Sequence, residues 1–227
     1  MSFSLRSVET LLAAATLATM VGCGSNSGTN MPIVTEDGGV DAGGGDTDAG
    51  GDTDAGGMCT IPESGFGASV GTKLRPFTLE QCLVNESGDG YSAPFAFYEN
   101  GYCESRFTVL SIAAGWCGPC NLESDEFNQQ ITQIYGPQGV RLIQVLIQDV
   151  SGAPPSIDFC NQWVNQHDLA NPELMDPAGV TQIYFPGNSL PSTIIIDSTG
   201  TIVYREFGTS ESLVGLRHEL DTLLAGS

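Results

Sequence analysis

The last 170 residues of the chain alternate between apolar runs and stretches in which apolar residues recur at helical spacing. Residues 107–113 and 140–147 are rich in apolar and β-branched side chains, which indicates two buried strands. Between them, residues 117–135 repeat apolar side chains about every 3.6 positions, and Gly136-Pro137 ends the repeat. The pattern therefore predicts a strand, a helix and a second strand in succession.

The same pattern predicts further elements on either side of this unit. They are a short strand over 95–98, a helix from Pro154 to about residue 164, strands over 192–197 and 201–207 joined by the turn Ser198-Thr199-Gly200, and a helix capped by Ser210 that ends near Leu224. Such alternation predicts a layered α/β fold with a mixed sheet. Residues 58–227 are enough for one domain with a single core.

The first 22 residues have the pattern of a targeting segment. Arg6 precedes an apolar stretch over 11–21, which is shorter than the roughly 20 residues that span a bilayer and suits a signal peptide. The stretch ends in Met20-Val21-Gly22-Cys23, which resembles a bacterial lipobox. An ordinary secretory signal with an incidental cysteine is the alternative. We expect a signal peptide over 1–22, a lipid on Cys23 that anchors the protein to the membrane, and a location in the bacterial cell envelope, facing the periplasm or the exterior.

Residues 23–57 follow as a tether. Positions 24–57 hold 11 Gly and 7 acidic residues, without Lys or Arg. Such a composition cannot bury enough apolar surface to offset its ordering entropy, so we expect a flexible, self-repelling linker. A calcium site is the alternative interpretation, but the acidic residues lack EF-hand spacing.

The charge balance excludes some partners. With 7 Lys and Arg against 27 Asp and Glu, the net charge is −20, whereas nucleic-acid binding needs clustered basic residues. The only histidines, His167 and His218, leave little for a histidine-based metal site. We therefore expect neither a nucleic-acid partner nor a bound metal.

The strongest candidates for a reactive site are Trp116-Cys117-Gly118-Pro119-Cys120, which lie between a predicted strand and a predicted helix. A cysteine at a helix N-terminus lies near unpaired N–H groups and the positive end of the helix dipole, which stabilise a thiolate. Pro119 suits the first helical turn. Cys117 is expected to attack a substrate disulfide and Cys120 to resolve the mixed disulfide, so that the cysteine pair serves in place of a cofactor.

Two other interpretations of this pair are a purely structural disulfide and half of a zinc site. Zinc usually requires a second pair of ligands, and the remaining cysteines contain no second C-x-x-C. The position between a buried strand and an amphipathic helix favours redox chemistry.

The five-residue string is the thioredoxin active-site motif, and the predicted order of elements resembles the thioredoxin fold. Over about residues 68–224 the chain most resembles the membrane-associated TlpA/ResA-like thiol-disulfide oxidoreductases. The matching segments are Pro76-Phe77-Thr78-Leu79, Glu123 after the cysteines, Leu190-Pro191-Ser192-Thr193-Ile194 and the turn Asp197-Ser198-Thr199-Gly200. The resemblance implies a mixed central sheet with flanking helices and a cis-proline loop.

The resemblance also implies roles for four residues near the cysteines. Pro191 is expected to be cis and to lie beside Cys117, with the backbone of Leu190 offering strand-like hydrogen bonds to a bound substrate. Glu123 and Asp149 are candidates to take the proton of Cys120, unless both are solvated surface acids. The chain departs from thioredoxin at Ser111, where thioredoxin has a buried Asp.

Four cysteines remain besides Cys23 and the reactive pair. An even remainder in an exported domain indicates two structural disulfides, for which three pairings are possible. We expect Cys82 to pair with Cys103 and Cys59 with Cys160.

Together these features predict an extracytoplasmic thiol-disulfide oxidoreductase that reduces protein disulfides and draws on a membrane electron donor. A disulfide oxidase or isomerase is the alternative. A copper-handling module is a second class, with His167 as the candidate extra ligand. A peroxidase is a third, but thioredoxin-fold peroxidases carry a Thr three residues before the reactive cysteine, and this position is Ala114.

Overall fold

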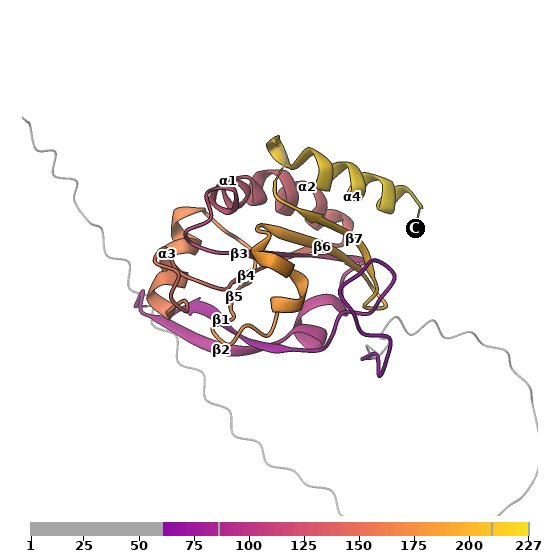
Figure 1. Cartoon of the computed structure of the whole chain (residues 1–227). Helices are drawn as coiled ribbons and strands as arrows, with labels where there is room; N and C mark the ends of the chain where they lie inside the picture. The colour runs from indigo at the N-terminus through magenta and orange to yellow at the C-terminus, as the bar shows by residue number, and fades with distance from the viewer. Residues whose placement is uncertain (1–60, 86, 210, 227) are drawn as a thin grey trace, which may run out of the picture. The chain divides into compact units, whose positions relative to one another are not determined.

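The computed structural model describes residues 61–85, 87–209 and 211–226. The predicted signal peptide, the lipidation site, the tether and Cys59 lie outside these residues. Within them, seven strands form one sheet in the order β2-β1-β5-β4-β3-β6-β7 (Figure 1). The strands are β1 Thr78–Val84, β2 Gly90–Ala96, β3 Phe107–Ala113, β4 Val140–Leu146, β5 Glu173–Met175, β6 Ser192–Asp197 and β7 Ile202–Phe207.

The sheet is mixed, as the sequence predicts. Strands β3, β4 and β5 run parallel to one another, and the remaining pairs are antiparallel. The connections from β3 to β4 and from β4 to β5 step in the same direction across the sheet. Because crossover connections between parallel strands are right-handed, both connections place their helix on the same face of the sheet.

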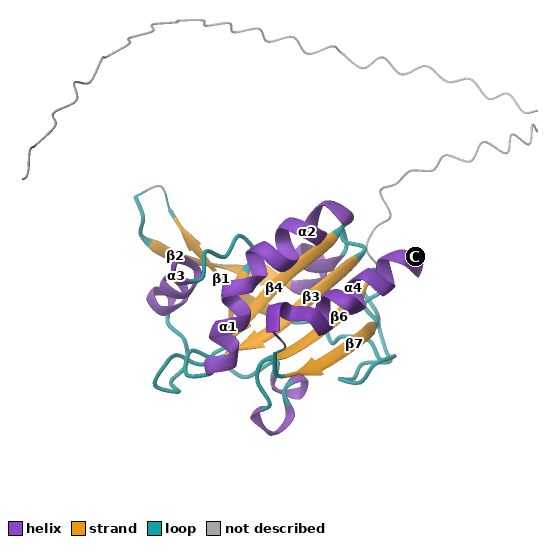
Figure 2. Ribbon diagram, turned by 90° about the horizontal axis from the view of Figure 1, so that it is seen from above, coloured by secondary structure: helices purple, strands orange, loops and turns teal. Residues whose placement is uncertain are grey.

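The α-helices cover that face, as Figure 2 shows for α1, α2 and α4 above the central strands and for α3 beside β1 and β2. They are α1 Gly118–Phe127, α2 Gln133–Tyr135, α3 Ile157–Gln166 and α4 Val214–Gly226. A π-helical turn joins α1 to α2, so the predicted helix over 117–135 exists as one winding stretch. The other helical segments are π-helices Phe97–Tyr102 and Asn128–Thr132 and 3₁₀-helices Gly136–Gln138, Gln182–Tyr184, Pro186–Asn188 and Glu211–Leu213.

Apolar side chains fill both faces of the sheet. On the helix side, residues such as Phe127, Trp163 and Leu216 form one buried cluster. On the opposite side, Phe97 and Tyr184 belong to a second cluster under the short helices. The central strands are buried on both faces, which explains why their sequences are almost continuously apolar.

One predicted strand is misplaced. Residues 95–98 were expected to be extended, but β2 ends at Ala96, and the chain enters the π-helix at Phe97. The apolar run there is buried because a helical turn packs against the sheet, so its apolar character does not imply a strand.

The expected pairing of the structural cysteines is wrong. Cys82 on β1 is bonded to Cys160 on α3, with a Cα–Cα distance of 6.1 Å, which excludes both Cys82–Cys103 and Cys59–Cys160. Cys103 is disulfide-bonded as well. The reason is the placement of α3 over the β1–β2 hairpin, which brings residues separated by 78 positions together.

In the described part of the chain, no helix combines the length and the apolar character that crossing a bilayer requires.

Candidate active site

The two reactive cysteines lie where β3 ends and α1 begins. Cys117 has an extended backbone and caps α1, and its Sγ accepts a hydrogen bond from the backbone N–H of Cys120 at 3.2 Å. Pro119 lies in the first turn of α1, where backbone N–H groups have no partner within the helix, so its missing N–H costs no hydrogen bond. The two cysteines form a disulfide, so the structure represents the oxidised protein. Cys117 is 4% exposed and Cys120 is fully buried, so Cys117 is the more accessible residue of the pair.

The turn before Cys117 requires glycine at position 115. A Cβ added to Gly115 would lie 2.5 Å from the ring of Phe159 and 2.8 Å from the backbone of both Asp149 and Val150. The Gly115 N–H donates to the carbonyl of Gln148 at 2.9 Å. The loop after β4 therefore packs directly on the cysteine turn and fixes its position.

Trp116 stands at the rim of this turn. Its side chain is 46% exposed, and its indole N–H donates to Oε1 of Gln148 at 2.8 Å. Gln148 was not identified from the sequence, because a glutamine after a strand carries no distinguishing signal. The bond holds an exposed apolar surface beside Cys117.

The peptide between Leu190 and Pro191 is cis, which confirms the prediction. β6 pairs with β3 up to Ser192 opposite Ile112, so the proline precedes β6 at the end of the sheet where the cysteine turn begins. The carbonyl of Pro191 accepts from the N–H of Gly208 at 2.8 Å. Among the described residues, no hydrogen bond uses the backbone of Leu190.

Glu123 is fully buried on the same face of α1 as Cys120, one turn away. Its carboxyl accepts from the hydroxyl of Ser111 at 2.9 Å and from that of Thr193 at 3.1 Å. Burial raises the pKa of Glu123 from 4.5 to about 8, although the two hydroxyl donors counteract the rise. The chain therefore has a buried carboxyl, that of Glu123, in contact with Ser111, the position at which thioredoxin has a buried Asp.

Asp149 does not share this environment. Its exposed carboxylate accepts from the N–H and hydroxyl of Ser151, both at 2.8 Å, and from the N–H of Ala153 at 3.0 Å. The Ser151 hydroxyl is the largest cause of a lowered pKa at Asp149. A lowered pKa makes a carboxylate a weaker proton acceptor, so the surroundings of the two acids favour Glu123 over Asp149 as the candidate.

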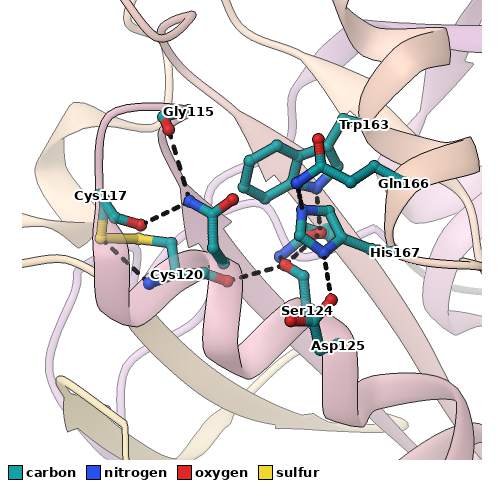
Figure 3. A network of polar contacts seen from close by, with 10 residues as sticks. Gly115, Cys117, Cys120, Ser124, Asp125, Trp163, Gln166 and His167 are labelled. Atoms are coloured by element: carbon teal, nitrogen blue, oxygen red, sulfur yellow. Dashed lines mark hydrogen bonds and ion pairs between the residues drawn. A yellow bond between two sulfur atoms is a disulfide. The ribbon is translucent and has the colours of Figure 1, made fainter. Parts of the chain in front are cut away.

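A polar network continues from the second cysteine into the core (Figure 3). The Ser124 hydroxyl donates to the carbonyl of Cys120 at 2.9 Å and accepts from the Gln144 amide at 2.9 Å. The indole N–H of Trp163 donates to Gln144 at 3.0 Å. These bonds fix α1 to β4 and α3 and so hold Cys120 in place.

His167, the candidate extra copper ligand, is used elsewhere (Figure 3). Its Nδ1 lies 2.7 Å from Asp125, its Nε2 lies 3.3 Å from the amide of Gln166, and its ring packs 4.3 Å from that of Trp163. In the described ranges, no group of three or more His, Cys, Asp or Glu side chains is arranged to hold a metal ion.

A model of the AhpC/TSA family matches residues 70–205. The chain belongs to the AhpC/TSA family. The match begins before β1 and ends within β7, and it includes the cysteine turn and the cis-proline. A comparison with curated protein sequences finds no match.

Solved structures share the fold of this family member at low sequence identity. A proposed thiol:disulfide interchange protein DsbE from Chlorobium tepidum has 19% identity and a TM-score of 0.52, over 69% of this chain and 98% of that one. An uncharacterised conserved protein from Geobacillus kaustophilus has 20% identity and a TM-score of 0.54, over 70% of this chain and 84% of that one. A secreted thiol-disulfide isomerase from Corynebacterium glutamicum has 19% identity and a TM-score of 0.50, over 67% of this chain and 85% of that one. The predicted thioredoxin-like fold is confirmed.

Proposed function

We propose that the protein is an extracytoplasmic thiol-disulfide oxidoreductase that reduces disulfides of other proteins through Cys117 and Cys120. The observation that carries this proposal is the arrangement of the cysteine pair, with one sulfur at the N-terminus of α1 and the other buried one turn further along. The names of the compared proteins from Chlorobium tepidum and Corynebacterium glutamicum agree with it.

The chemistry follows from the positions of the two sulfurs. The Cys117 thiolate attacks a substrate disulfide and forms a mixed disulfide, while the other substrate sulfur leaves as a thiolate. Cys120 then attacks Cys117 and gives its proton to the carboxylate of Glu123, and the second substrate sulfur leaves. Two electrons pass from the cysteine pair to the substrate. Bound substrate would extend along Leu190 and pair with its backbone N–H and carbonyl.

Two competing functions are less well supported. A peroxidase would require a Thr three residues before the reactive cysteine, and Ala114 lies there instead. A copper site would require His167, whose two ring nitrogens already contact Asp125 and Gln166.

The proposal is tested with Cys120→Ser, which leaves Cys117 able to attack but removes the resolving sulfur. Incubated with a protein that contains an accessible disulfide, the reduced variant should accumulate a covalent complex that mass spectrometry maps to Cys117. Cys117→Ser is the matched control and should form none. Absence of a complex with Cys120→Ser would contradict the function. Equilibration of the wild type with glutathione buffers gives the reduction potential, and a value near −120 mV, that of a strong oxidant, would instead favour the oxidase alternative.

We also propose that a lipid on Cys23 tethers the domain to a membrane of the bacterial cell envelope, through the linker over 24–57, and that a membrane protein supplies the electrons. The support is the lipobox-like sequence and the composition of the linker. Cys23→Ser, expressed in a bacterium, should move the protein from the membrane fraction to the soluble fraction. A variant that stays with the membrane would contradict lipid anchoring.

A further inference from the structure

A row of polar side chains crosses the sheet beneath Glu123. Ser111 on β3 pairs in register with Thr193 on β6, and Thr193 pairs with Glu206 on β7. Side chains at paired positions of neighbouring antiparallel strands lie on the same face, and the first two donate to Glu123, so Glu206 also faces the helix side. The row leads from the buried carboxyl to β7, which is an edge strand.

Glu206 is itself held in place. The hydroxyl of Tyr204, two residues earlier on the same face of β7, donates to its Oε2 at 2.9 Å. The carboxyl is half-buried, and burial raises its pKa. The adjacent Arg205 points to the opposite face, where its guanidinium donates to the carbonyl of Tyr184 at 2.6 Å, so this cation does not neutralise Glu206.

Within the described residues, the titratable groups that interact with Glu206 or with its partner Tyr204 are acidic or phenolic. They are Glu123 from α1, Tyr204 from β7 and, beyond Tyr204, Glu219 from α4. No basic side chain forms an ion pair with Glu123 or Glu206 in the part of the chain that the structure describes. Two carboxyls in one partly dehydrated row disfavour a negative charge on both, and the charge of Glu206 adds to the raised pKa of Glu123.

We propose that Glu206 is a positioning residue for the proton transfer at Cys120, because its charge raises the pH at which Glu123 accepts and releases that proton. This inference rests on the proposed function. When Cys120 attacks the mixed disulfide, its proton passes to the Glu123 carboxylate. A charged Glu206 makes Glu123 a stronger proton acceptor, and protonation of Glu206 weakens it. The half-exposed Glu206 thereby makes the buried reaction responsive to external pH.

The test measures Glu123 directly. In the oxidised protein, the carboxyl ¹³C shift of Glu123 is followed against pH in the wild type and in Glu206→Gln. The variant should titrate at lower pH than the wild type, because one negative charge is removed. Glu206→Asp keeps the charge and should titrate close to the wild type. Glu80→Gln makes the same substitution at an exposed position of β1 and should leave the titration unchanged. An unmoved midpoint in Glu206→Gln would overturn the inference.

A kinetic experiment connects this titration to the closure of the Cys117–Cys120 disulfide. Reduced protein is mixed with oxidised glutathione, and closure of the Cys117–Cys120 disulfide is followed against pH. With a pKa of about 8, about one tenth of Glu123 is ionised at pH 7. Because burial is the main cause of this raised pKa and Glu206 the smallest, closure in Glu206→Gln should be faster at pH 7, but by clearly less than the roughly tenfold that full ionisation of Glu123 would give. A wild type that does not react with glutathione would overturn the proposed function and this inference together. Reaction with identical pH profiles in both proteins would overturn this inference alone.

Discussion

Raising the pH from about 4.5 to 8 should lower the free energy of unfolding of the oxidised domain by several kcal/mol, and Glu123→Gln should remove a large part of that loss. The cause is the buried carboxyl of Glu123, whose pKa is raised from 4.5 to about 8 by burial. Both hydroxyls that contact it can donate to a carboxylic acid or to an amide oxygen, so glutamine preserves the site.

The sign follows from which state binds the proton. Below pH 4.5 both the folded and the unfolded chain hold it, and the raised pKa contributes its full stabilisation. Above 4.5 the unfolded chain releases the proton while the folded chain keeps it, so stability falls by about 1.4 kcal/mol per pH unit. The fall ends near pH 8, where the folded protein also releases it, after about 4 to 5 kcal/mol.

Glu173 should add to this slope in the same direction. It is buried on β5, neither carboxyl oxygen has a hydrogen-bond partner among the described residues, and burial raises its pKa well above the ordinary value. Urea unfolding at several pH values between 4.5 and 8 measures the total, and the difference between wild type and Glu123→Gln isolates Glu123. Glu80→Gln, at an exposed position, should leave the slope unchanged. If Glu123→Gln retains the full wild-type slope, the carboxyl is not protonated in the folded protein.

Removing the cross-link between β1 and α3 should cost about 4.5 kcal/mol of unfolding free energy. The Cys82–Cys160 bond closes a loop with a sequence separation of 78, and the chain-entropy estimate for such a loop is about 4.5 kcal/mol. The measurement is urea unfolding of the double variant Cys82→Ala/Cys160→Ala under non-reducing conditions.

The reactive pair provides the matched control for this experiment. Cys117→Ala/Cys120→Ala removes a disulfide with a sequence separation of only 3, for which the same estimate is about 2 kcal/mol. The expected order is a larger loss without the Cys82–Cys160 bond. Equal losses in the two double variants would show that loop entropy does not determine the contribution of either bond.

The elements that the sequence predicted well are those with a single strong pattern. The bounds of β3 and β6 agree with the prediction because both strands are buried on both faces and read as almost unbroken apolar runs. The cysteine turn was recognisable because a tight turn, a helix start and two cysteines coincide in five residues. The cis peptide before Pro191 was expected only from the family resemblance.

The elements that the sequence did not predict depend on contacts between distant segments. β5 has three residues, too few for a periodic pattern, and β2 contains Pro94 among exposed positions. The sequence does contain a signal for the burial of Glu123. Ser111 and Thr193 are polar positions inside two apolar strands, and inward-facing hydroxyls require a polar partner such as this carboxyl.

The β1–β2 hairpin is attached to the rest of the sheet only lightly. β1 meets β5 through two residue pairs, Glu80 with Met175 and Gln81 with Leu174, whereas β3 pairs with β4 over seven. A unit with few ladder bonds to its neighbour opens at lower free energy than the whole domain, and its amide protons exchange with solvent earlier. The covalent link from Cys82 to α3 limits how far such an opening can go, so the hairpin can open locally without separating from the domain.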